Sequence, residues 1–76
     1  MIQLRHRGVY KLPGEQRKVI AFDVGQSSYY LYDYEFGTRL PPRFKIDADG
    51  RLINWFQDFP IWAIEDLIDT EETYQG

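Results

Sequence analysis

The segment from Ser28 to Phe36 constrains the fold most, because its residues alternate with a period of two. One face of an extended chain here would carry Tyr30, Tyr32, Tyr34 and Phe36, and the other Tyr29, Leu31, Asp33 and Glu35. This period, together with the strand preference of tyrosine and phenylalanine, predicts a β-strand. We expect it to be the central strand of a small sheet, with an aromatic row that either packs in the core or stays partly open to a ligand.

Short strands are predicted on both sides of this segment, over residues 1–12, 17–24, 44–46 and 52–56. Ile20, Phe22 and Val24 share one face of the second strand, which we expect to be the face of the tyrosine row. The sequence Asp47-Ala48-Asp49-Gly50 is typical of a tight turn and joins the last two strands as a hairpin. Residues 37–42 contain two adjacent prolines and are predicted as a linking loop.

A helix is predicted over residues 58–69. Asp58 can cap its first amides and Pro60 is tolerated in its first turn. One helical face would carry Ile61, Ile64, Leu67 and Ile68. The alternative is a short final strand over residues 61–64, and the sequence leaves both open.

These elements predict a small α+β domain that is mainly β. Five antiparallel strands, two hairpins plus an N-terminal strand, form a curled sheet or partly open barrel, and one C-terminal amphipathic helix covers it. The domain is expected to span residues 1–72, with residues 73–76 as a flexible C-terminal tail. A chain of 76 residues without cysteine depends for its stability on its core or on a partner subunit.

Charge is distributed unevenly along the chain, whose net charge is −3. The first quarter is basic, whereas no lysine or arginine follows Arg51 and acidic residues accumulate there. One explanation is a solvated acidic helix face and a frayed tail. The other is that the two ends attract each other, within one molecule or between copies.

We expect a cytoplasmic protein that does not associate with membranes. The basic start lacks an apolar run, so it does not resemble a signal peptide. No apolar run approaches the length that crosses a bilayer. The absence of cysteine fits a reducing compartment.

No catalytic, metal or cofactor site is predicted, and we do not expect an enzyme. His6 stands between Arg5 and Arg7, whose charges disfavour the imidazolium and a bound cation. The turn at 47–50 resembles the start of a calcium loop, but Lys45 and Phe56 stand where further oxygen ligands would be needed. No glycine-rich phosphate loop is present.

The run Leu31-Tyr32-Asp33-Tyr34 resembles the ALYDY motif of SH3 domains, in which tyrosines line a groove for proline-rich peptides. The resemblance covers these four residues. The family motif opens its domain, whereas here it lies inside the chain; Phe56 follows Trp55 in place of tandem tryptophans, and the late Pro-x-x-Tyr signature is missing. We therefore interpret the match as a coincidence in a tyrosine-rich strand.

Two functions are left as hypotheses. The first is a non-enzymatic interaction module that binds an unidentified protein partner or self-associates through Tyr30, Tyr32, Tyr34, Arg39 and Arg43. The second is a single-stranded nucleic-acid binder of small-barrel type that uses a basic N-terminal patch with one stacking ring. That patch consists of Arg5, Arg7, Tyr10, Lys11, Arg17 and Lys18.

Overall fold

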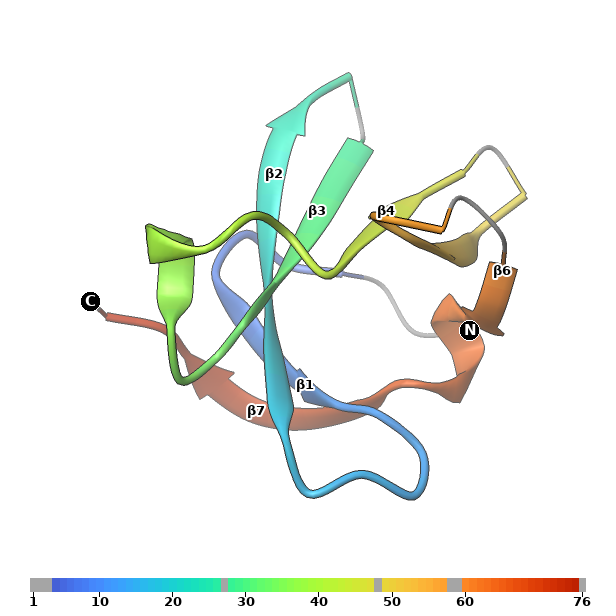
Figure 1. Cartoon of the computed structure of the whole chain (residues 1–76). Coiled ribbons are helices and arrows are strands. Elements are labelled where there is room, and N and C mark those ends of the chain that lie inside the picture. Colours follow the sequence, from blue (N-terminus) through green and yellow to red (C-terminus); the bar gives the residue numbers. More distant parts are fainter. Residues whose placement is uncertain (1–3, 27, 48, 58–59, 76) are drawn as a thin grey trace.

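A computed structural model describes residues 4–26, 28–47, 49–57 and 60–75. In this part of the chain all the regular structure is strand or short 3₁₀ helix. The strands are β1 (Gly8–Lys11), β2 (Lys18–Gly25), β3 (Ser28–Asp33), β4 (Phe44–Ile46), β5 (Arg51–Asn54), β6 (Pro60–Ala63) and β7 (Ile68–Thr73). The 3₁₀ helices are η1 (Gly37–Arg39) and η2 (Ile64–Asp66). The chain is therefore all-β, with one seven-stranded antiparallel sheet curled into a half-barrel (Figure 1).

The strand order explains the curl. The sheet order is β6-β5-β4-β3-β2-β1-β7, so the first six strands follow each other as neighbours and β7 returns to pair with β1. Only η2 and Leu67 separate the end of β6 from the start of β7, although these strands form opposite edges of the sheet. The sheet must therefore curve until its two edges lie near each other, as Figure 1 shows.

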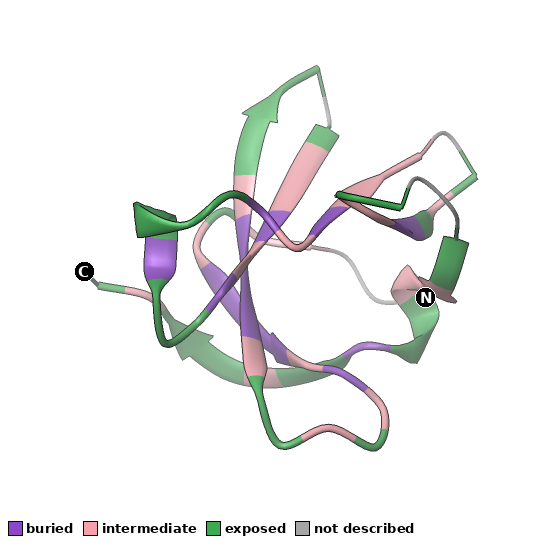
Figure 2. Ribbon diagram, in the orientation of Figure 1, coloured by how far each residue is buried: buried purple, intermediate pink, exposed green. Residues whose placement is uncertain are grey.

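The core lies on the concave side of the curled sheet. It contains Tyr10, Leu12, Val19, Ala21, Leu31, Phe44, Leu52 and Leu67. Along β2 and β3 the core residues alternate with those on the face of the tyrosine row. Figure 2 shows that the buried residues lie mainly in the middle of the strands. The sequence left open whether the tyrosine row is core or binding face. In the structure the row lies on the face opposite this core, where Tyr30 and Tyr32 are half-buried and Tyr34 is exposed.

The tyrosine row does share a face with the apolar residues of β2, as predicted. Ile20 is opposite Tyr32, and Phe22 is opposite Tyr30. The rings of Phe22 and Tyr32 meet edge to face with centroids 5.2 Å apart. Such pairs contribute about 0.5–1.5 kcal/mol beyond burial, so this outer face supports the hairpin as well.

The predicted C-terminal helix, the α+β class and the five-stranded sheet are wrong, since the sheet of the described residues has seven strands. Residues 60–63 form β6, which agrees with the alternative of a final strand, and residues 68–73 form β7. Asp58 and its capping role lie outside the described residues. The β-branched residues of this segment favour strands, and acidic residues near a helix C-terminus oppose the macrodipole. The free edge of β1 offers backbone partners that a helix would not use.

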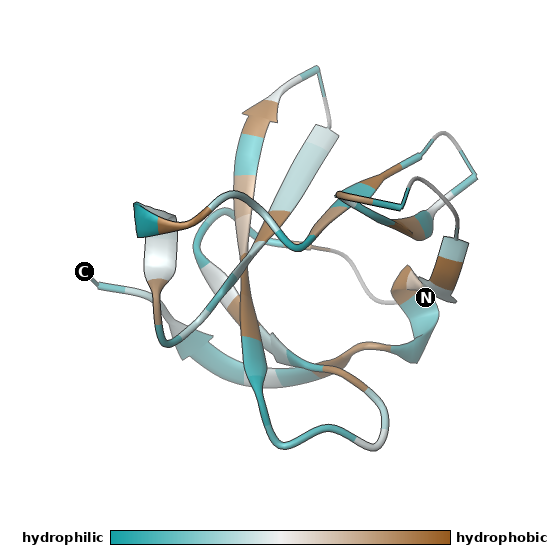
Figure 3. Ribbon diagram, in the orientation of Figure 1, coloured by the Kyte–Doolittle hydropathy of each residue, from teal (hydrophilic) through white to brown (hydrophobic). Residues whose placement is uncertain are grey.

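Acidic β7 is held against the basic N-terminal half by ion pairs. Arg5 donates to Asp69 at 3.1 Å, and Lys18 donates to Glu72 at 2.8 Å. The hydrogen bond to Glu72 raises the pKa of Lys18 above its ordinary value of 10.5. Figure 3 shows that β7 is hydrophilic along most of its length. The two ends of the sequence thus attract each other within the molecule, which explains why an acidic segment is placed in the sheet.

A bulge in β7 brings its carboxylates to these partners. Gly8 is opposite Thr73 and Tyr10 is opposite Asp69, so three residues of β7 match the single residue Val9 of β1. Glu71 takes a left-handed backbone with φ of 64° at the bulge. The expected tail begins at the end of β7, and the Tyr74 amide donates to the Arg7 carbonyl at 2.7 Å.

The hairpin of β4 and β5 agrees with its prediction, and Asp47 organises its turn. One carboxylate oxygen of Asp47 accepts from the amides of Asp49 and Arg51, both at 2.9 Å. The Arg51 amide first, then the Asp49 amide and the Arg51 charge, hold the pKa of Asp47 below its ordinary value of 3.8. The ionised carboxylate is therefore stabilised by folding.

Asp47→Asn is expected to lower the free energy of unfolding at pH 7 and to lose this effect in acid. Because the folded pKa is depressed, the contribution is present above the unfolded pKa and disappears as the pH falls through the folded value. Urea denaturation of both proteins from pH 7 to pH 2.5 measures this. Asp49→Asn serves as the control, because the Asp49 side chain is 75% exposed. A deficit that stays constant down to pH 2.5 would contradict the assignment.

Candidate functional site

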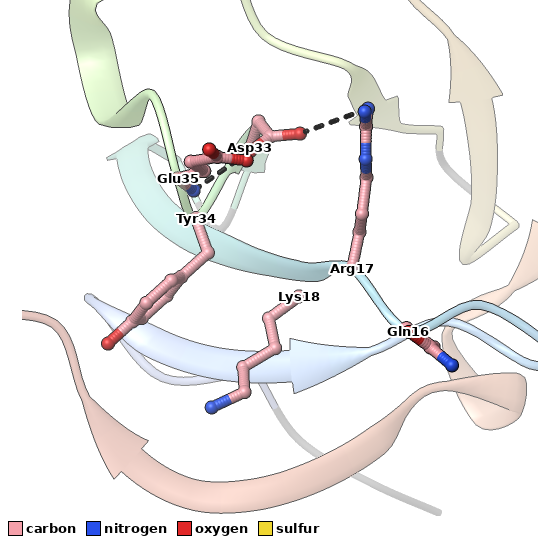
Figure 4. Close-up of a pocket in the computed structure, with 6 residues that line it drawn as sticks. All are labelled: Gln16, Arg17, Lys18, Asp33, Tyr34 and Glu35. Carbon is pink, nitrogen blue, oxygen red and sulfur yellow. Dashed lines mark hydrogen bonds and ion pairs between the residues drawn. The ribbon is translucent and has the colours of Figure 1, made fainter.

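An apolar hollow of about 320 Å³ lies at the surface beside η1. We call it the apolar hollow, and its lining consists of Arg17, Asp33, Phe36, Leu40, Pro41, Pro42, Arg43 and Phe56. A more polar hollow of about 260 Å³ adjoins it and is lined by Gln16, Arg17, Lys18, Asp33, Tyr34 and Glu35 (Figure 4). Arg17 and Asp33 line both hollows.

Three large apolar side chains of the hollow are open to solvent. Phe36 is 39% exposed, Leu40 47% and Phe56 76%. Phe36 and Leu40 flank η1, whereas Phe56 follows β5, so two segments far apart in the sequence supply them. A cluster of exposed apolar residues of this kind usually marks an interaction site, whereas single exposed residues do not.

The backbone under these side chains is anchored on both sides. The Arg43 amide donates to the Leu31 carbonyl at 2.7 Å, and the Trp55 amide donates to the Arg43 carbonyl at 2.9 Å. Pro41 and Pro42 restrict the chain between η1 and β4. The Asn54 side chain accepts from the amides of Phe56 and Gln57, both at 3.0 Å. The hollow is therefore held by the sheet beneath it.

Asp33 forms the floor between the two depressions. It is 6% exposed, and its side chain accepts from the Glu35 amide at 2.8 Å. Its other oxygen lies 3.8 Å from an Arg17 nitrogen, an ion pair longer than a hydrogen bond. Figure 4 shows both interactions, with Tyr34 and Lys18 directed to the other side of the sheet. Asp33 thus turns the chain after β3 and lends Arg17 a nearby negative charge.

Asp33→Ala is expected to lower the free energy of unfolding by about 1–2 kcal/mol, since the Glu35 amide loses its acceptor. Asp33→Asn retains an acceptor oxygen, and we expect a loss of about 0.5 kcal/mol or less. Urea denaturation of the two variants provides the comparison. Equal losses would show that the charge of Asp33, and not its hydrogen bond, stabilises the turn.

The predicted partner-binding residues are distributed over two regions. Tyr30 and Tyr32 are half-buried, and Tyr30 packs on Trp55 with ring centroids 4.9 Å apart. Tyr34 is 38% exposed and lies between Lys18 and Tyr74. Arg43 lines the apolar hollow, and Arg39 is exposed next to Leu40. Tyr30 and Tyr32 are therefore mostly packed, whereas Tyr34 lines the more polar hollow.

The predicted nucleic-acid patch is largely occupied within the molecule. Tyr10 is 0% exposed, so its proposed role as a stacking ring is wrong in this structure. Arg5 and Lys18 pair with β7, and the Arg7 guanidinium lies over the Tyr74 ring at 5.7 Å. Lys11 is half-buried in β1. Arg17, 65% exposed, is the member of the patch that borders the hollow.

Sequence reasoning missed six residues of the apolar hollow: Asp33, Phe36, Leu40, Pro41, Pro42 and Phe56. Leu40 carried a signal, since an apolar residue in a proline-containing loop has no strand face on which to be buried. Phe36 was assigned to the tyrosine row, but the chain leaves β3 at Asp33. Phe56 and Leu40 lie at the same hollow because of the way β3, β4 and β5 pair, and no local sequence pattern indicates that pairing.

The described part of the chain includes the one histidine of the sequence. No group of three or more histidine, cysteine or acidic residues could hold a metal ion there. The ring of His6 accepts from the Asp23 amide at 3.1 Å and touches the edge of Phe22. Nor does any described helix have the length and apolar character needed to cross a bilayer.

Comparison with known proteins identifies no relative of this chain. The sequence matches no protein-family model, and no curated protein or solved structure is significantly similar to it. The site must therefore be interpreted from its own chemistry.

Proposed function

We propose that the chain is a non-enzymatic interaction module that binds a protein partner through the apolar hollow. The observation that supports this most is the exposure of Phe36, Leu40 and Phe56 around one depression. In a domain of 76 residues, leaving three large apolar side chains open forgoes stability that burial would provide. A partner that covers them recovers it.

The surroundings of the hollow support the same function. Protein interfaces combine an apolar centre with a polar rim, and arginine is enriched in them. Here the apolar side chains lie between Arg17 and Arg43, and Arg39 is adjacent. Other exposed apolar residues, such as Val24 and Ile68, are outside this lining. The proposed surface thus shifts from the tyrosine row to the loop that follows it.

Site-specific photocrosslinking in the host cell tests the proposal. A photoreactive phenylalanine analogue at Phe56, the most exposed residue of the hollow, is expected to give a discrete protein adduct. The same analogue at Val24, which is 46% exposed and outside the hollow, serves as the matched control. Leu40→Asp in the same chain is expected to abolish the adduct, because a charge at the contact must be desolvated.

The outcomes separate clearly. An adduct from position 56 that is lost with Leu40→Asp supports the proposal. No adduct from position 56, or equal adducts from positions 24 and 56, would overturn it. An adduct removed by nuclease treatment would also overturn it, in favour of a nucleic-acid ligand.

A further inference from the structure

We infer that the apolar hollow selects a peptide segment of its partner in which large apolar side chains are flanked by carboxylates. The inference rests on the proposed function and adds the chemistry of the ligand. It depends on the charges around the hollow, which are opposite in sign to the net charge of the molecule. The protein as a whole carries −3, whereas the lining of the hollow contains Arg17 and Arg43 against one carboxylate, Asp33, and Arg39 adjoins it.

The guanidinium groups around the hollow have unused donors. One terminal nitrogen of Arg43, Nη1, is buried without a hydrogen-bond partner. The other, Nη2, donates to Glu15 at 3.4 Å, near the limit of a hydrogen bond. Arginine binds carboxylates most strongly with two short parallel hydrogen bonds. Because Nη1 is enclosed, a carboxylate from outside would reach this guanidinium through Nη2, whose contact with Glu15 is long.

Arg17 and Arg39 extend this pattern along the rim. The Arg17 side chain is 65% exposed, and its nearest carboxylate, Asp33, is 3.8 Å away. Arg39 donates to the Phe36 carbonyl at 3.3 Å, and no carboxylate of the described chain pairs with it. Arg17 and Arg43 therefore line the hollow and Arg39 adjoins it. Asp33 is the nearest carboxylate of Arg17, and Glu15 is that of Arg43.

This arrangement contrasts with the basic N-terminal half of the sheet. There, Arg5 and Lys18 are paired with Asp69 and Glu72 of the same chain, both at 3.1 Å or less. At the hollow the carboxylate contacts of Arg17 and Arg43 are longer, at 3.8 and 3.4 Å. A basic rim of this kind beside exposed apolar side chains favours a ligand that supplies both carboxylates and apolar groups. A nucleic acid would supply charge without filling the apolar surface, so we favour a peptide.

Binding of designed peptides to the full chain tests the inference. The probe is a short fluorescein-labelled peptide that places one phenylalanine and one leucine among aspartates. A second peptide replaces both apolar residues by serine, and a third replaces the aspartates by lysines. Fluorescence anisotropy gives the affinity, and amide shifts of the ¹⁵N-labelled protein locate the site. We expect the first peptide to bind about tenfold or more tightly than either control, with shifts around Leu40 and Phe56.

Arginine variants provide the second part of the test. Arg43→Gln is expected to weaken binding of the first peptide by about tenfold or more, and Arg17→Gln and Arg39→Gln by about threefold each. Lys11→Gln, which removes a positive charge outside the hollow, should leave the affinity unchanged. Arg17 and Arg39 are exposed, so their variants test the inference even if Arg43→Gln fails to fold. Rising salt should weaken binding, since the rim charges become screened.

Several results would overturn the inference. Binding of the lysine peptide that is at least as tight as that of the first peptide, or amide shifts outside the hollow, would do so. Unchanged affinity for the first peptide in all three arginine variants would also contradict it. So would binding of an oligothymidylate that is tighter than that of the first peptide, or a dimer of the chain that covers the hollow. If the peptides fail while the adduct at position 56 persists, the chemistry inferred here is wrong and the interaction function stands. If both fail, the proposed function is wrong as well.

Discussion

Replacement of Tyr10 by alanine is expected to lower the free energy of unfolding by about 3–5 kcal/mol. Tyr10 is the largest fully buried side chain of the core and belongs to the strand between β2 and β7. A domain of this size has a total stability of roughly 4–11 kcal/mol. The cavity left by the ring would therefore remove a large part of it, and the variant is expected to be partly unfolded at 37 °C.

Tyr10→Phe distinguishes the contribution of the hydroxyl from that of the ring. The hydroxyl accepts from the Arg5 amide at 2.8 Å, and burial raises the pKa of Tyr10 above 10.0, so it stays neutral. Removing this acceptor is expected to lower the free energy of unfolding by about 1 kcal/mol. Urea denaturation followed by tryptophan fluorescence measures both variants. If Tyr10→Ala were no worse than Tyr10→Phe, the ring would not be the core residue described here.

Gly37→Ala is expected to lower the free energy of unfolding by about 2–4 kcal/mol, for two reasons. Gly37 is buried with φ of 59°, a left-handed backbone that disfavours alanine by about 1–2 kcal/mol. A Cβ at this position would also lie 2.6 Å from the Tyr74 hydroxyl oxygen, so the ring must move. That ring touches Phe22 and Tyr34, each with centroids 6.0 Å away.

A double-mutant cycle isolates the contact with Tyr74. In a Tyr74→Phe background the nearest ring atom is 3.5 Å from the added Cβ, which is an ordinary contact. Gly37→Ala should then lower the free energy of unfolding only by the contribution of the left-handed backbone. Gly14→Ala is the matched control, because Gly14 has φ of 72° and no atom lies within 4 Å of an added Cβ. We expect Gly37→Ala to exceed Gly14→Ala by about 1–2 kcal/mol and the cycle to recover that difference. Additive losses would show that Tyr74 does not cover η1.

The C-terminal segment shows where sequence patterns reach their limit. Ile61, Ile64, Leu67 and Ile68 fit one helical face, yet they lie in β6, in η2, in the link after η2 and in β7, respectively. The spacing of apolar residues in so short a segment fits a helix or a pair of short strands. The edge of β1 and the positive charges of Arg5 and Lys18 decided between them, and both are distant in sequence.

The candidate site was also only partly accessible from the sequence. Arg39 and Arg43 were singled out for their charge beside an aromatic strand, and both lie at the apolar hollow or next to it. The role given to the tyrosine row changed, because the curl of the sheet buried the face of Leu31 and covered much of the opposite face. Sheet curvature follows from the pairing of all seven strands and leaves no local pattern.

By itself, the sequence determined that the segments before the C-terminal one are extended. Alternation of large side chains along 18–25 and 28–33, and the turn chemistry at 47–50, specify these strands because both act within a few residues. Only the tertiary structure decided which face of each strand is buried, that the acidic end becomes an edge strand, and which loop side chains meet around the apolar hollow. These depend on contacts between residues far apart in the chain, and their free energy exists only when the sheet is assembled.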